Sequence, residues 1–246
     1  MSPDGRRPIR IAHRGGNSQP LLRRALAAGV DWIETDIWLH YGRLVARHDR
    51  SLWRLPIMYS RRSVSLMLAP EIVLDSLLDA TQGTPTCVLI DLKGRGQRLP
   101  DALVSVLRRR NAFNRTALCG KNWASLDRAR ALDPRTRVFF TLERTKHLDA
   151  YLARRRDGSA PPAISCFHGL LTPATVDALK AAGATIFAWT IDSEQRARQL
   201  LAWGVDGITS NRLDMLSRLV PLLPSPDPPA DSGSATAARV CPDSQA

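Results

Sequence analysis

The chain has 246 residues, 44% of them hydrophobic, which suits one globular domain with a sizeable core. Its formal net charge is +12, yet only four of the 35 cationic residues are lysine. This arginine excess allows two interpretations, a surface for nucleic acid or anionic membranes and a compositional bias on solvated helices. We favour the second because no basic stripe is interleaved with aromatic residues.

Neither the N-terminus nor any later stretch carries an apolar run of signal-peptide or membrane-spanning length. The four cysteines form no C-x-x-C pair and show no framework spacing. These features argue against a disulfide scaffold, a thiolate metal site and a membrane-spanning protein. We therefore expect a soluble cytoplasmic protein, for which peripheral membrane contact stays open and a nucleic-acid partner is disfavoured.

Strands and helices alternate along the chain. The expected strands are residues 9–13, 32–39, 87–92, 116–120, 137–142, 163–167, 185–191 and 205–209, with a short return strand at 44–48. The expected helices are 20–28, 73–81, 101–110, 124–132, 146–155, 173–182 and 193–203. The sixth of these has Thr172 as its cap, Pro173 in its first turn and Gly183 after its end.

Eight strands that nearly all alternate with helices predict an α/β protein with a closed (β/α)8 barrel, the TIM barrel. A doubly wound open sheet is the alternative. We expect the barrel to span residues 8–220. The Pro- and Ser-rich residues 221–246 lack any apolar periodicity, so we expect them to form a disordered tail.

Polar side chains gather at the expected C-terminal strand ends, where barrels of this kind place their active sites. Glu34 and Asp36 are two residues apart on a strand, so both project to the same face, between bulky tryptophans. Paired buried carboxylates are costly unless a positive charge lies between them, and a hard divalent cation prefers such oxygens. The other candidates at this mouth are His13, Arg14, His48, Asp91, Lys93, Lys121 and Trp189.

These motifs resemble the glycerophosphodiester phosphodiesterase family, a group of phospholipase C-like phosphodiesterase TIM barrels. The resemblance rests on His13-Arg14-Gly15 after the first strand, Glu34-x-Asp36 on the second, His48-Asp49 soon after, and Asp91-x-Lys93 on the third. Ala188-Trp189-Thr190-Ile191-Asp192 near the chain's end resembles the family too.

The resemblance implies a metal-dependent hydrolase that cleaves glycerophosphodiesters, a reaction of lipid metabolism, to an alcohol and glycerol phosphate. Glu34, Asp36 and Asp91 would hold one divalent cation, Mg or Ca. His13 and His48 would be the acid–base pair, Arg14 and Lys93 would grip the phosphate, and Trp189 would contact the small-molecule or lysolipid substrate. Two histidines can exchange protons near neutral pH, which agrees with these roles.

The chain departs from the family in three places. The family usually opens its first helix with P-E-N-T, whereas Gly16-Asn17-Ser18-Gln19-Pro20 is shorter and lacks the acid. The third ligand is Asp91 rather than Glu, and the segment after His48 is short. Two alternatives follow: a lysophospholipase D or sphingomyelinase D-like lipid phosphodiesterase, suggested by Asp-x-Lys, and a catalytically weak barrel that binds acidic ligands.

Overall fold

The computed structural model describes residues 7–47, 50–51, 57–59, 64–66, 72–94 and 96–219. A ring of eight parallel strands forms its centre: β1 (Ile9–Ala12), β2 (Trp32–His40), β8 (Cys87–Leu92), β9 (Thr116–Gly120), β10 (Val138–Leu142), β11 (Ala163–Phe167), β12 (Thr185–Trp189) and β13 (Gly207–Ser210). They pair in this order around the sheet, and pairing of β1 with both β2 and β13 closes it. The closed ring confirms the predicted barrel and excludes the open sheet.

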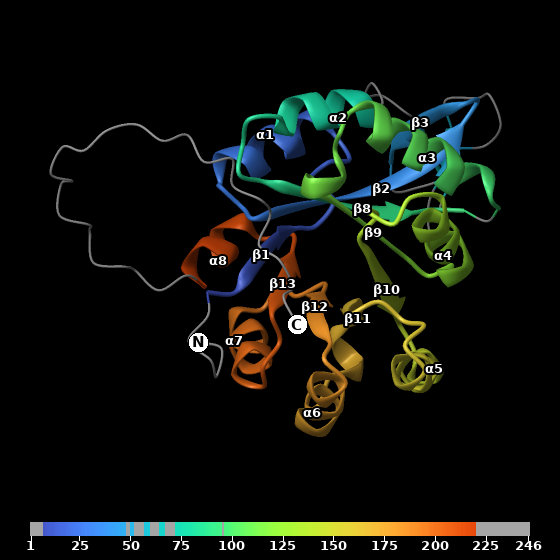
Figure 1. Cartoon of the computed structure of the whole chain (residues 1–246). Helices are drawn as coiled ribbons and strands as arrows, with labels where there is room; N and C mark the ends of the chain where they lie inside the picture. Colours follow the sequence, from blue (N-terminus) through green and yellow to red (C-terminus); the bar gives the residue numbers. More distant parts are fainter. Residues whose placement is uncertain are drawn as a thin grey trace, which may run out of the picture.

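Helices cover the outside of the strand ring (Figure 1). They are α1 (Gln19–Ala27), α2 (Leu74–Thr81), α3 (Arg98–Arg109), α4 (Trp123–Leu132), α5 (Thr145–Arg156), α6 (Pro173–Ala181), α7 (Glu194–Ala202) and α8 (Leu213–Arg218). Short 3-10 turns occur at Phe113–Arg115 and His168–Leu170. Helix α3 begins three residues before its predicted start, because Pro100 is tolerated within the first turn of a helix.

The segment between β2 and α2 holds more structure than the sequence predicted. The return strand is β3 (Arg43–Ala46), which pairs antiparallel with β2, and β7 (Ile72–Val73) adds to its free edge. A separate antiparallel sheet consists of β4 (Arg50–Ser51), β5 (Ile57–Tyr59) and β6 (Val64–Leu66). Of these strands the sequence predicted only the return strand, because the others are too short to carry a periodic signal.

The barrel interior is closed at its N-terminal half by aromatic side chains. The Trp32 ring packs edge-on against Phe139 at 6.2 Å and Phe187 at 6.0 Å between ring centroids, and all three are buried. Side chains of a strand alternate between its faces, so Glu34 and Asp36 follow Trp32 on the inner side in successive layers towards the mouth. These buried aromatic side chains therefore fill the barrel beneath the two carboxylates.

Helix α6 carries the capping residues that the sequence predicted at its two ends. The Thr172 hydroxyl accepts a hydrogen bond from the backbone N–H of Thr175 at 3.2 Å, with Pro173 at the first position of α6. Gly183 follows at φ +70°, a left-handed conformation that favours glycine after a helix. Helix α6 is thus confirmed with the start and stop signals expected of it.

Many arginines link neighbouring helices. Arg128 of α4 contacts Asp101 of α3 at 2.6 Å, and Arg154 of α5 contacts Asp127 of α4 at 3.1 Å. Arg108 of α3 reaches Asp133, just after α4, at 3.0 Å. The arginine excess is therefore used partly inside the fold, beyond the solvated faces that we expected.

Two further expectations, the tail and the lack of a membrane-spanning segment, concern residues that the structure describes only in part. The proposed tail, residues 221–246, lies outside them, whereas the barrel elements run from Ile9 to Arg218. In the described part of the chain, every helix is too short or too polar to span a bilayer.

Candidate active site

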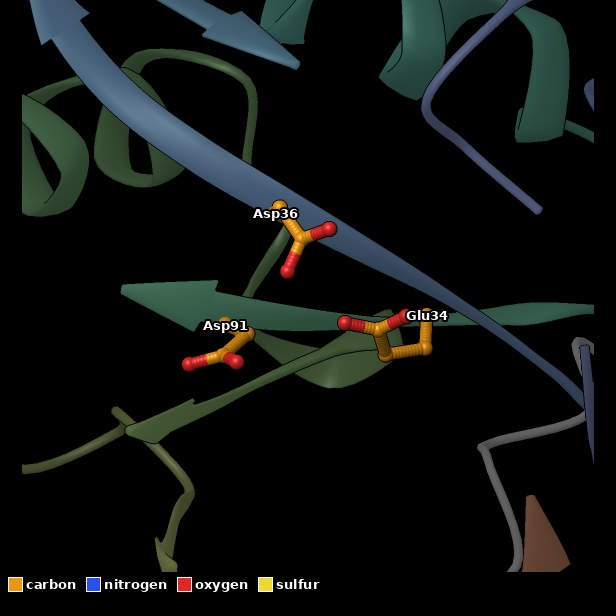
Figure 2. Close-up of side chains that lie close together, drawn as sticks. All are labelled: Glu34, Asp36 and Asp91. Atoms are coloured by element: carbon orange, nitrogen blue, oxygen red, sulfur yellow. The ribbon is translucent and has the colours of Figure 1, made fainter. Parts of the chain in front are cut away.

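Three carboxylates converge at the C-terminal mouth of the barrel. Glu34 and Asp36 come from β2, and Asp91 comes from the adjacent strand β8, where it is the register partner of Asp36 (Figure 2). One ligand oxygen from each lies within 4.8 Å of the others. Glu34 and Asp36 are buried, with 6% and 2% of their surface exposed. The E-x-D and D-x-K spacings thus bring the predicted acids together.

Lys93 is the internal counter-ion of this acid cluster. Its Nζ lies 2.7 Å from Asp36 Oδ1 and also contacts Asp91 Oδ2. Burial opposes its charge, but the carboxylates of Asp91 and Asp36 raise the pKa of Lys93 overall. Lys93 is therefore a permanent cation placed between two of the three acids.

One lysine does not neutralise three acids. Burial, followed by the negative charges of Asp36 and Asp91, raises the pKa of Glu34 well above its ordinary value. Burial also raises the pKa of Asp91, although Lys93 opposes this shift. The cluster therefore favours a further positive charge if all three groups are to ionise together.

The loop after β1 wraps around Glu34 and Asp36. The backbone N–H of Arg14, a residue at φ +54°, donates to Glu34 Oε2 at 2.7 Å, and the Arg14 Nε lies 4.0 Å from Asp36 Oδ2. Gly16 packs so closely that a Cβ there would lie 2.7 Å from the Cβ of Thr35. Only a glycine lets the loop approach β2 this closely.

Asn17 is a positioning residue that sequence reasoning did not assign. Its Nδ2 donates to Asp36 Oδ2 at 2.7 Å, while its Oδ1 accepts from the Asp36 backbone N–H at 2.9 Å and from the Thr35 hydroxyl at 3.0 Å. The amide thus ties the carboxylate and the backbone of one residue together. Only its place directly after H-R-G-G could have pointed to it.

His13 belongs to a hydrogen-bonded chain that runs from the end of β1 to the end of β13, the two strands that pair as the first and last of the barrel. Its Nδ1 lies 2.8 Å from Asn211 Oδ1, and Asn211 Nδ2 donates to Asp192 Oδ2 at 2.7 Å. Asp192 Oδ1 accepts from the Ser210 hydroxyl at 2.8 Å and from the Asn211 backbone N–H at 2.9 Å. Burial raises the pKa of Asp192, but its bonds to Asn211 and Ser210 outweigh this and lower it overall.

This network assigns the His13 tautomer. An ionised Asp192 can only accept, so the Asn211 amide must turn its NH2 towards Asp192 and its oxygen towards His13. The proton of a neutral His13 ring therefore lies on Nδ1, and Nε2 keeps its lone pair. Sequence reasoning assigned no role to Asp192 or Asn211.

The second predicted histidine, His48, lies outside the described residues. The preceding residue, Arg47, is buried, and its backbone N–H donates to the Asp36 carbonyl at 2.9 Å. The Trp38 indole N–H donates to the Arg47 carbonyl at 3.1 Å. These bonds fix the chain beside Asp36 up to Arg47.

The described candidates share one cavity of about 210 Å³. Its lining includes His13, Arg14, Glu34, Asp36, Asp91, Lys93, Lys121 and Trp189. Phe167, at the end of the adjacent strand β11, is exposed and packs 5.5 Å from Trp189 between ring centroids. His40, His147 and His168 are absent from the lining among the described residues.

The donor set fits a hard divalent cation. Metal–oxygen distances of 2.0–2.6 Å leave ligand oxygens at most about 4 Å apart around Mg²⁺ and about 5 Å apart around Ca²⁺. The observed spread of up to 4.8 Å suits Ca²⁺ as it stands and Mg²⁺ after a small contraction. Burial and the neighbouring Asp36 and Asp91 raise the pKa of Glu34, and a bound cation would oppose this shift.

Comparison with known proteins gives a family match and a curated relative. Residues 91–215 match the glycerophosphoryl diester phosphodiesterase family. The probable glycerophosphodiester phosphodiesterase 2 of Mycobacterium tuberculosis is 31% identical over 241 residues, covering 85% of this chain and 89% of that protein.

Solved structures share the fold at low sequence identity. A glycerophosphodiester phosphodiesterase from Parabacteroides distasonis superposes with a TM-score of 0.72 at 19% identity, covering 87% of this chain and 96% of that one. An Oleispira antarctica phosphodiesterase, solved with the product sn-glycerol-3-phosphate, gives a TM-score of 0.70 at 20% identity, with 86% and 96% covered. On the strength of the family match and the curated relative, the chain belongs to the glycerophosphoryl diester phosphodiesterase family and is a phosphoric diester hydrolase.

Proposed function

We propose that the protein hydrolyses small glycerophosphodiesters to an alcohol and glycerol phosphate in a metal-dependent reaction. The observation that carries this proposal is the convergence of His13, three carboxylates and Lys93 in one cavity. The family match supports the substrate class, as does the sn-glycerol-3-phosphate product bound by the Oleispira antarctica relative.

Glu34, Asp36 and Asp91 would hold one Mg²⁺ or Ca²⁺ ion. When bound, such an ion supplies positive charge that stabilises a non-bridging phosphate oxygen. Asn17 would keep Asp36 in place, because its hydrogen bond occupies Oδ2 and leaves Oδ1 directed at Lys93. The missing P-E-N-T acid therefore need not abolish the site, since an amide supports the ligand instead.

Acid–base chemistry falls to His13 and His48. Hydrolysis forms a new P–O bond to the nucleophile, which loses a proton, and breaks the bond to the alcohol, whose oxygen gains one. Because Asn211 holds the proton of His13 on Nδ1, Nε2 is the ring atom that can accept a proton or, once protonated, donate it. We assign the opposite half of this transfer to His48.

Arg14, Lys93 and Trp189 would bind the substrate. The Arg14 Nε is buried and makes no hydrogen bond among the described residues, so it has a donor to spare for a phosphate oxygen. Lys93 adds a second cation at the same level of the cavity. Trp189 provides an apolar wall against which the carbon skeleton of the substrate can pack.

Phosphorus NMR of the purified full chain tests this function. Glycerophosphocholine and glycerophosphoglycerol would be incubated with Mg²⁺, with Ca²⁺ or with EDTA, and we expect glycerol phosphate to form only with a metal. His13→Ala should lower kcat about 100- to 10,000-fold, whereas the control His40→Ala should not. Turnover that persists in EDTA and in His13→Ala would reject the mechanism, and the spectra would reveal any cyclic phosphate.

A further inference from the structure

A group of cations lies at the edge of the cavity without enough acids to balance it. Lys121 follows β9 and lines the cavity, Arg144 follows β10, and Lys146 lies in the first turn of α5. We call these three residues the basic rim. All are exposed, and Glu143 is the carboxylate among them, 2.8 Å from Lys121 Nζ.

The rim cations act on the same small region. Lys121, by its hydrogen bond, and then Arg144, by its charge, lower the pKa of Glu143 despite its partial burial. Burial and the charges of Lys146 and Arg144 lower the pKa of His147, whose Nδ1 accepts the Glu143 backbone N–H at 3.2 Å. One carboxylate therefore faces three permanent positive charges.

The opposite end of α5 is arranged differently. There Arg154 pairs with Asp127 at 3.1 Å, and Arg155 donates to the Ala182 carbonyl at 2.9 Å. Arg144 and Lys146, by contrast, make no ion pair within the described ranges. The two cations at the N-terminal end of α5 therefore lack the acidic partner that Arg154 has.

The rim also lies across the mouth from the acid–base site. In the closed ring, β10 is four strands away from β1 in either direction, so Arg144 and His13 follow strands on opposite sides of the barrel. Lys121 is the rim residue that reaches the site, because it lines the cavity together with Asp91 and Lys93. A ligand held at the carboxylate cluster could therefore extend along Lys121 to Arg144 and Lys146.

We propose that the basic rim binds a second anionic group of the substrate, so that the preferred diesters carry an additional phosphate or carboxylate on the alcohol. This inference rests on the proposed function and adds a substrate class to it. A cationic alcohol such as choline would meet a net positive charge there, and a neutral alcohol would leave Arg144 and Lys146 without an anionic partner. An anionic group at the rim pairs with them without touching the reacting atoms.

Matched substrates separate this proposal from general attraction of anions. Glycerophosphoglycerol has one phosphodiester, and bis(glycerophospho)glycerol adds a second phosphate to the same skeleton. Glycerophosphoserine tests a carboxylate, and glycerophosphocholine tests a cation. After correction for its two cleavable bonds, we expect the bis-diester to have the highest kcat/KM, mainly through a lower KM.

The test and control variants are chosen at the two ends of helix α5. Arg144→Gln/Lys146→Gln should lower the preference for the bis-diester over glycerophosphoglycerol roughly three- to tenfold, as expected for two exposed ion pairs. Arg156→Gln, an exposed residue at the far end of α5, is the matched control and should leave that ratio unchanged. If the double variant leaves the ratio unchanged, the rim proposal is wrong. Equal losses of kcat/KM on both substrates are one such result, and they would indicate long-range steering instead.

A binding arm keeps the test independent of turnover. Calorimetry on His13→Ala with Mg²⁺ or Ca²⁺ should show tighter binding of the bis-diester than of glycerophosphoglycerol, and Arg144→Gln/Lys146→Gln in that background should abolish the difference. Equal affinities would overturn the rim proposal even where the enzyme turns over. A wild type without turnover that still prefers the bis-diester would reject the proposed function and retain the rim.

Discussion

Replacement of Asp192 by asparagine should disable His13 without touching it. Asp192 accepts three hydrogen bonds, two at Oδ1 and one at Oδ2 from the Asn211 amide. In Asp192→Asn, the new side chain keeps one oxygen for Ser210 and the Asn211 backbone but presents an NH2 group to the Asn211 NH2. Two donors then face each other, so the Asn211 amide turns over and offers its NH2 group to His13.

The turned amide requires His13 Nδ1 to accept, which moves the ring proton to Nε2, the atom that must take up a proton. Keeping the active tautomer instead leaves one exposed hydrogen bond mispaired, at a cost of about 0.5 to 1.5 kcal/mol. Since 1.4 kcal/mol corresponds to tenfold in rate, kcat should fall about 2- to 12-fold. This loss is smaller than the full contribution of general acid–base catalysis, and KM should change little.

Steady-state kinetics on glycerophosphocholine give the rate, and the ring carbon and nitrogen shifts of His13 report its tautomer. The exchange variant Asp192→Asn/Asn211→Asp restores one donor and one acceptor between the two positions, with the carboxylate now accepting from His13. It should recover both the tautomer and most of the lost activity. If Asp192→Asn keeps the wild-type kcat and tautomer, the inferred chain from Asp192 to His13 is wrong.

Two further changes probe the loop after β1 and the base of the barrel. Asn17→Ala removes the amide that holds Asp36 and should weaken Mg²⁺ or Ca²⁺ binding about 10- to 100-fold, measured by calorimetry without substrate. Asp31→Asn weakens the partly buried hydrogen bonds to Arg10 and should lower the free energy of unfolding by about 1 to 3 kcal/mol at pH 7. Although burial raises the pKa of Asp31, its arginine hydrogen bonds lower it overall, so this contribution is present above about pH 4 and is lost as the pH falls further. Urea titrations at several pH values, with exposed Asp149→Asn as control, should show the difference shrinking in acid; a constant difference would contradict this account.

The sequence predicted the barrel and the carboxylates because both follow from short-range periodicity. Strand alternation requires Glu34 and Asp36 to share a face, and it does the same for Asp91 and Lys93. Closure of eight parallel strands then places both pairs at one mouth. Register pairing of Asp36 with Asp91 is the step that turns two separate motifs into one cluster.

The supporting residues could not be predicted in the same way. Asn17 reaches Asp36 only because Gly16 packs against Thr35, a contact between a loop and a strand that no periodic pattern encodes. Asn211 meets His13 across the seam where the last strand pairs with the first, 198 residues apart in the chain. Such partners depend on barrel closure, so their sequence neighbours carry no sign of them.

The distribution of charge also bears on the choice between a hydrolase and a barrel that merely binds acidic ligands. A net charge of +12 suggests a diffuse polyanion surface, but pairs such as Arg128–Asp101 and Arg154–Asp127 lock arginines between helices. Such pairs reduce the attraction that a long anionic ligand would feel along the barrel wall. The carboxylate cluster would also repel a ligand that needed only positive charge. Its position beside His13 instead suits a site that brings a cation to a phosphate, and this separation of charge within one cavity is what hydrolysis of a diester requires.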